Sequence, residues 1–202
     1  MRRTIITLNR ERRMSNIMKV VALAAVCAPL SLSAQTMTAT AMPAQSTAPA
    51  IGAIAPDFTA QGADQSASQT ISLSKLRGHV VVLAFYPADR SGGCTHELNK
   101  FRDEYSQIFG PDVVVLPISE DSLGSHVSWA KEAKFPFSLV SDEGGRIATA
   151  YSSMMAGRPY ASRTVFVIGK DGRIADENLK FGALDQHAYD WLTSAVTKAK
   201  SE

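Results

Sequence analysis

One cysteine stands where the surrounding residues favour a reactive thiol. Cys94 follows Gly92 and Gly93, shortly after an apolar run that ends at Pro87. A helix that begins here places Cys94 in its first turn, where unpaired backbone N–H groups and the helix dipole favour an anion. A thiolate is such an anion, and it is the nucleophilic form of cysteine. The segment therefore predicts a nucleophilic cysteine.

The apolar pattern on either side predicts the elements that position this cysteine. Residues 79–86 are apolar almost throughout and indicate a central strand, whereas apolar residues recur at helical spacing over 94–109. The link from a buried strand to a helix is where open α/β sheets place their sites. We therefore expect Cys94 at the carboxyl edge of a central strand.

Strand-like and helical patterns alternate along the rest of the chain, which predicts an α/β fold. Crossover connections lead into two apolar strands, and this pattern favours a mixed central sheet with helices on both faces. The other predicted strands cover 71–73, 112–118, 137–140, 163–168 and 173–175, and the other predicted helices cover 122–134, 145–151 and 185–198.

The first 50 residues differ in character from the rest. A basic stretch, an apolar run over 20–32 and small residues ending at Ala34 have the layout of a secretory signal peptide. We expect cleavage after Ala34, with Ala41 as a second candidate. Residues 35–50 carry no charge and no period, which is typical of a flexible linker. The prediction is a signal peptide over 1–34, a linker over 35–50, one domain over 51–202, and export to the periplasm or beyond.

Charge and composition exclude several classes of function. The formal net charge is +2, and the basic excess gathers before residue 20, so the domain has no basic patch that would bind nucleic acid. The four histidines show no metal-ligand spacing, and no glycine pair matches a phosphate loop. We therefore expect no metal and no cofactor. Because Cys27 lies in the leader, the exported chain would keep Cys94 as its only cysteine.

Three residues carry a resemblance to a known family. Pro87, Ser91 and Cys94 match the pattern P-x-x-x-[TS]-x-x-C, and the segment therefore resembles the active site of the peroxiredoxins. The wider run over 85–105 is similar to their Q-type, or bacterioferritin-comigratory, branch. Further similarities lie in order over 55–58, 73–78 and 163–168. The resemblance implies a thioredoxin-like fold over 51–202.

The resemblance also implies a role for each site residue. Cys94 would be the nucleophile that attacks a peroxide and becomes a sulfenic acid. The Ser91 hydroxyl would hydrogen-bond the thiolate and the peroxide, and Pro87 would shield the site from water. Arg163 would hold the thiolate and stabilise charge on the breaking O–O bond. Glu97 would have a supporting role.

The chain departs from the Q-type pattern at two positions. Ser91 stands where threonine is frequent, which keeps the hydroxyl but loses a methyl group. Asn99 stands where the branch commonly has a resolving cysteine, five residues after the first. The resemblance then implies a one-cysteine cycle, in which an outside thiol, from a thioredoxin-like protein or a small molecule, reduces Cys94. We expect a monomer or weak dimer.

Several other interpretations remain open at this point. Cys94 is unreactive if it is simply buried in the core, Arg163 is consistent with an ordinary salt bridge, and Glu97 is explained by the helix dipole alone. A thioredoxin-fold disulfide or metal-handling protein needs a second nearby thiol, which is absent. The missing resolving cysteine leaves a non-peroxidatic binding or chaperone module in the periplasm as the alternative function.

Overall fold

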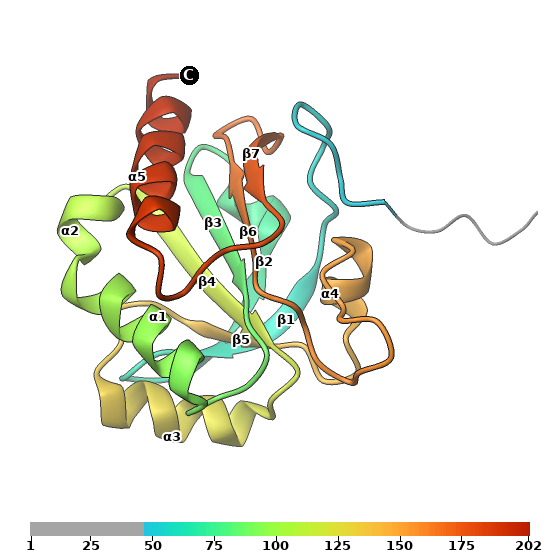
Figure 1. The fold of residues 1–202 in the computed structure, drawn as a ribbon, viewed down its shortest axis with the longest axis vertical. Coiled ribbons are helices and arrows are strands. Elements are labelled where there is room, and N and C mark those ends of the chain that lie inside the picture. The colour runs from blue at the N-terminus through green and yellow to red at the C-terminus, as the bar shows by residue number, and fades with distance from the viewer. Residues whose placement is uncertain (1–46) are drawn as a thin grey trace, which may run out of the picture. The chain divides into compact units, whose positions relative to one another are not determined.

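The computed structural model describes residues 47–202 (Figure 1). The predicted signal peptide and most of the predicted linker lie outside the described residues. The boundaries of the domain therefore stay predictions. Among the described residues, no helix is both long and apolar enough to cross a membrane.

A mixed sheet forms the centre of the domain. Its strand order is β2-β1-β5-β4-β3-β6-β7. Strands β3, β4 and β5 run parallel, whereas β1, β2, β6 and β7 pair antiparallel with their neighbours. The strands are β1 (Thr59–Ala63), β2 (Ser68–Ser72), β3 (Val80–Phe85), β4 (Val113–Ser119), β5 (Leu139–Ser141), β6 (Thr164–Ile168) and β7 (Ile174–Asn178).

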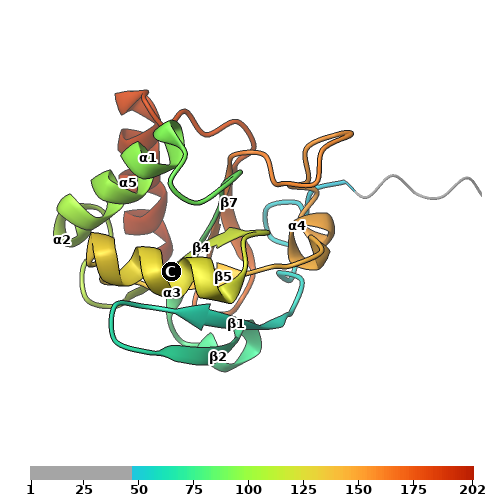
Figure 2. The same ribbon diagram turned by 90° about the horizontal axis from the view of Figure 1, so that it is seen from below.

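Helices cover both faces of this sheet, as predicted. Helices α1, α3 and α5 pack on one face and α4 packs on the other, on the right in Figure 1. Figure 2 shows α3 lying against the part of the sheet that contains β1 and β5. The helical segments are η1 (Leu73–Leu76), α1 (Gly92–Asp103), α2 (Tyr105–Ile108), α3 (Leu123–Ala133), α4 (Arg146–Ala150) and α5 (Gln186–Ser201).

Strand β3 is central because every one of its side chains is apolar and buried. Val80, Val82 and Ala84 pack into the cluster beneath α1, α3 and α5, whereas the alternating residues pack into the cluster beneath α4. A strand buried on both faces has neighbours on both sides, here β4 and β6. The prediction of a central strand is confirmed, and a short link joins its carboxyl end to α1.

The largest differences from the sequence prediction concern two regions. The single helix predicted over 94–109 begins earlier, at Gly92, and breaks at Glu104, where the backbone leaves helical geometry (φ −105°, ψ 18°). The break lets Ile108 and Phe109 turn into the same core as Phe101. Strand β1 was not predicted, because its sequence TAQGA lacks apolar alternation. Its pairing with β2 and β5 stabilises it instead.

Candidate active site

The site lies at the start of α1. Cys94 is the third residue of this helix and is fully buried. Ser91 is the N-cap residue, with an extended backbone (φ −69°, ψ 150°), but its side chain makes no capping hydrogen bond and is exposed. Pro87 is half-buried just past the end of β3. The first turn thus holds the sulfur where backbone N–H groups and the helix dipole favour an anion.

Arg163 reaches the sulfur from a distant part of the chain. Its Nη2 donates a hydrogen bond to Cys94 Sγ at 3.4 Å. The placement follows from the register, because β6 runs antiparallel to β3 and pairs Thr164 with Phe85. The residue just before Thr164 therefore lies beside the carboxyl end of β3, where α1 begins. The structure brings Cys94 and Arg163 together, as the resemblance implied.

Glu97 completes this group of three. It lies on α1 just beyond Cys94, is fully buried, and accepts a hydrogen bond from Arg163 Nη1 through Oε2. Its other oxygen, Oε1, has no hydrogen-bond partner. Burial raises the pKa of Glu97 to about 7, although the Arg163 guanidinium acts in the opposite direction. The carboxyl group is thus held in contact with the cation that faces the sulfur.

Arg163 stays charged in this environment. Burial lowers the pKa of Arg163, but the Glu97 carboxylate and the Cys94 sulfur act more strongly together, so the net direction is upward. A fixed guanidinium beside a buried sulfur stabilises a thiolate and any negative charge that develops next to it. The arrangement therefore suits nucleophilic attack by Cys94.

Gly93 allows the guanidinium to come this close. A Cβ atom at this position would lie 3.0 Å from Arg163 Nη2, tighter than ordinary van der Waals contact. A Cβ atom at the neighbouring Gly92 would meet nothing within 4 Å. The glycine that the site requires is thus the second of the pair.

Comparison with known proteins decides the family. The model of the AhpC/TSA family matches residues 51–177. The chain belongs to the AhpC/TSA family. It is 38% identical over 124 residues to chloroplastic peroxiredoxin Q of Triticum aestivum, covering 60% of this chain and 55% of the relative. It is 37% identical over 131 residues to a protein of Coxiella burnetii named as a peroxiredoxin bcp, covering 62% of this chain and 85% of the relative.

Solved structures of this family share the fold. Enterococcus faecalis AhpC superposes with a TM-score of 0.68 at 22% identity, covering 76% of this chain and 93% of that chain. Peroxidoxin BcpB from Mycobacterium tuberculosis gives a TM-score of 0.64 at 26% identity, covering 74% and 97%. The thioredoxin-like fold and the resemblance to the Q-type branch are thereby confirmed. The chain spans about half the length of the first curated relatives that it matches.

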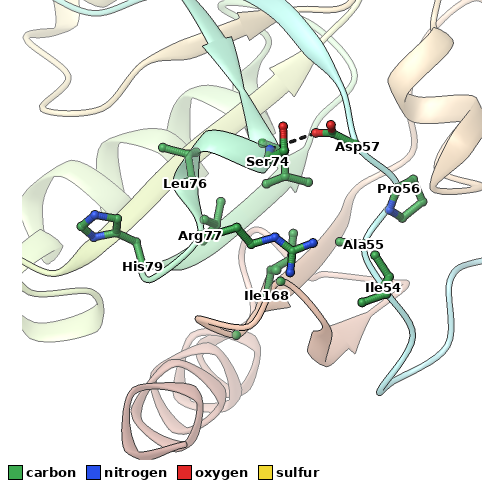
Figure 3. A pocket seen from close by; sticks show the side chains of 13 residues that line it. Ile54, Ala55, Pro56, Asp57, Ser74, Leu76, Arg77, His79 and Ile168 are labelled. Carbon is green, nitrogen blue, oxygen red and sulfur yellow. Dashed lines mark hydrogen bonds between the residues drawn. The ribbon is translucent and has the colours of Figure 1, made fainter.

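A cavity of about 290 Å³ lies elsewhere in this AhpC/TSA domain (Figure 3). It is lined near the opposite end of β3 by Val81, by Ile168 at the end of β6, and by Arg77 and His79. Cys94 is not among its lining residues. Within residues 47–202, no three or more His, Cys, Asp or Glu side chains gather as a metal site would require. The roles of Ser91 and Pro87 toward a peroxide stay predictions.

A polar cluster in the link that precedes Cys94 was not predicted from the sequence. Asp89, in the link between β3 and α1, contacts the fully buried His126 of α3. The spacing of the histidines indicated only that they do not form a metal site, and no pattern assigned a role to Asp89. The available signal was an acidic residue in a link between an apolar strand and the cysteine, which indicates a partner but does not identify it.

Proposed function

We propose that this protein is a thiol-dependent peroxidase that reduces hydrogen peroxide and organic hydroperoxides at Cys94. One observation carries the proposal: a fully buried cysteine in the first turn of a helix receives a hydrogen bond at 3.4 Å from a charged arginine. Such a sulfur is held as a nucleophile beside a cation that stabilises the transition state. Family membership and relatives named as peroxiredoxins support the same activity.

The oxidation step uses groups that are already in place. The Cys94 thiolate attacks one peroxide oxygen, so that an S–O bond forms as the O–O bond breaks. The second oxygen leaves with the electron pair, takes up a proton, and departs as water or an alcohol. Cys94 is thereby oxidised by two electrons to a sulfenic acid, and the peroxide is reduced. Arg163 stabilises the negative charge that spreads over the sulfur and the two oxygens.

The cycle closes with outside thiols. A first thiol attacks the sulfenic sulfur, releases water and forms a mixed disulfide with Cys94. A second thiol attacks that disulfide, releases the Cys94 thiolate and leaves as the oxidised reductant. Asn99 stands at the position of the resolving cysteine, and Cys94 is the one cysteine of the described residues, which supports a one-cysteine cycle. The reductant would be a thioredoxin-like protein or a small thiol, acting on a monomer or weak dimer.

A non-peroxidatic binding or chaperone module is the weaker alternative. Such a module has no need of a charged arginine on a buried cysteine, nor of a buried glutamate that contacts the same arginine. Burying charged groups is costly unless they are paired, and here both contacts meet at the guanidinium that faces Cys94. The geometry therefore favours the peroxidase.

We also propose that the protein works outside the cytoplasm. The support is the basic, apolar and small-residue layout of the first 34 residues. Cell fractionation of the full-length chain, compared with a chain that begins at residue 35, tests this proposal. Full-length protein that stays in the cytoplasm would contradict it.

One experiment tests the peroxidase proposal directly. Purified protein is mixed with one equivalent of hydrogen peroxide, and sulfenic acid is trapped and counted by mass spectrometry, with Cys94→Ser as the control. We expect one sulfenic acid per chain, formed orders of magnitude faster than on a free small thiol, and none at this position in the control. Reaction no faster than that of a small thiol would overturn the proposal.

A further inference from the structure

The Asp89 carboxylate accepts several hydrogen bonds in the link that precedes the reactive cysteine. Asp89 lies between Pro87 and Ser91, and its side chain is only 3% exposed. Its Oδ1 accepts a hydrogen bond from Tyr86 Oη at 2.7 Å. Its Oδ2 accepts a hydrogen bond from Ser125 Oγ at 2.6 Å and lies 3.0 Å from Nδ1 of His126. One carboxylate thus joins the end of β3 to the first turn of α3.

His126 meets acceptors on both sides of its ring. Nδ1 lies against Asp89, and Nε2 lies 3.2 Å from the carbonyl oxygen of Val140 in β5. The ring is therefore held between two oxygen acceptors that come from different parts of the chain. Burial raises the pKa of Asp89, but the contacts with His126, Ser125 and Tyr86 together outweigh this effect and lower the pKa overall. The carboxylate is therefore stable as an anion.

The backbone of the same link is fixed as well. The Asp89 N–H donates to Asp121 Oδ2 at 2.8 Å, and Asp121 Oδ2 also accepts from Ser119 Oγ at 2.8 Å. Together with the side-chain bonds, this contact ties Asp89 to residues that follow β4 and to α3. The link between β3 and α1 has little freedom at this point.

The next residue explains why such fixing is needed. Arg90 has a left-handed backbone (φ 58°), which non-glycine residues rarely adopt and which persists only when neighbours hold it. Its guanidinium donates to Ser128 at 2.9 Å and to Glu132 at 3.0 Å, both on α3. These contacts are exposed and contribute little, so the buried bonds of Asp89 are the stronger restraint.

We propose that Asp89 is a positioning residue for the peroxidase reaction. It touches no reacting atom, but it holds the turn that leads into α1, so that Cys94 stays buried and within hydrogen-bond reach of Arg163. Loosening Asp89 would let the first turn of α1 shift. The sulfur would then lose its contact with the guanidinium and become accessible to bulky reagents. The inference rests on the proposed function for its reaction, but not for the change in accessibility.

A matched pair of tyrosine variants tests this role. Tyr86→Phe removes one hydroxyl that donates to Asp89, whereas Tyr151→Phe removes a hydroxyl that donates to the Pro56 carbonyl oxygen, on the opposite face of the sheet. Each exchange removes the hydroxyl of a fully buried tyrosine together with its hydrogen bond to an oxygen acceptor, so we expect comparable losses of stability. Asp89→Asn should have the larger effect, because it removes the negative charge of the carboxylate. The asparagine side chain keeps the same shape.

Two rates separate positioning from a general loss of stability. The first is sulfenic acid formation with one equivalent of peroxide, and the second is alkylation of reduced Cys94 by a bulky maleimide without peroxide. We expect Tyr86→Phe to slow the first about tenfold and to speed the second by a similar factor. For Asp89→Asn we expect slower sulfenic acid formation and faster alkylation, both by larger factors than in Tyr86→Phe. Tyr151→Phe should keep wild-type values for both rates.

Each outcome bears on the inference. Equal rates in Tyr86→Phe and Tyr151→Phe would overturn it, even if Asp89→Asn fails to fold. A loss of both rates together in Tyr86→Phe would also overturn it, because positioning predicts changes in opposite directions. If the wild-type protein forms no sulfenic acid, the proposed function fails, while the maleimide rates alone still decide whether Asp89 holds Cys94 buried.

Discussion

An arginine lies near each end of β3, and the two ends differ in what the guanidinium contacts. At the carboxyl end, Arg163 is half-buried and contacts both Glu97 and Cys94. At the amino end, Arg77 is exposed and lines the cavity of about 290 Å³ (Figure 3). Its guanidinium lies against Gly172. Buried, paired charge therefore identifies the reactive end of β3 better than the presence of a cavity does.

Exchanging each arginine for alanine gives the largest expected contrast. Arg163→Ala removes the donor to the sulfur, and loss of one such donor typically slows a reaction about 10²–10³-fold. Arg77→Ala removes an exposed charge at the other end, so we expect its rate within about twofold of the wild-type rate. The measurement is single-turnover formation of sulfenic acid by stopped flow with trapping. Equal rates for the two variants would remove Arg163 from the site.

The sequence predicted that the reactive cysteine lies at the carboxyl end of β3, because a motif and a strand pattern both indicated this position. The apolar run that became β3 and the motif residues placed Cys94 at the start of a helix. Arg163 was predicted only through the resemblance, since the register of β6 against β3 is a long-range pairing that local patterns do not contain. The short β1 and the buried pair of Asp89 and His126 were missed for the same reason.

Glu97→Gln gives the second largest expected effect, which is a change in how the free energy of unfolding depends on pH. The pKa of Glu97 is raised from its ordinary 4.5 to about 7, so the folded protein binds this proton more tightly than the unfolded chain does. The stabilisation is complete below pH 4.5 and is lost as the pH rises through 7. Since one pKa unit is about 1.4 kcal/mol, the loss is on the order of 3 kcal/mol.

The free energy of unfolding, measured in urea at several pH values, tests this expectation. The difference between the wild-type protein and Glu97→Gln should fall as the pH rises from 4.5 to 7, because glutamine keeps the shape without the titration. The same experiment with Arg77→Ala should give a curve parallel to that of the wild-type protein. A constant difference between the wild-type protein and Glu97→Gln would show that Glu97 does not titrate in this range.

The smallest expected effect separates two adjacent glycines. Gly93→Ala brings a Cβ atom to 3.0 Å from Arg163 Nη2, the atom that donates to Cys94, so the guanidinium must move slightly, whereas Gly92→Ala meets open space. Overpacking costs about 1 kcal/mol at the low end, which corresponds to about fivefold in rate. Both exchanges favour the helix equally, so sulfenic acid formation that is about fivefold slower only in Gly93→Ala isolates the contact with Arg163. Equal rates in the two variants would mean that the Arg163 guanidinium accommodates the added methyl group and keeps its hydrogen bond to Cys94 Sγ.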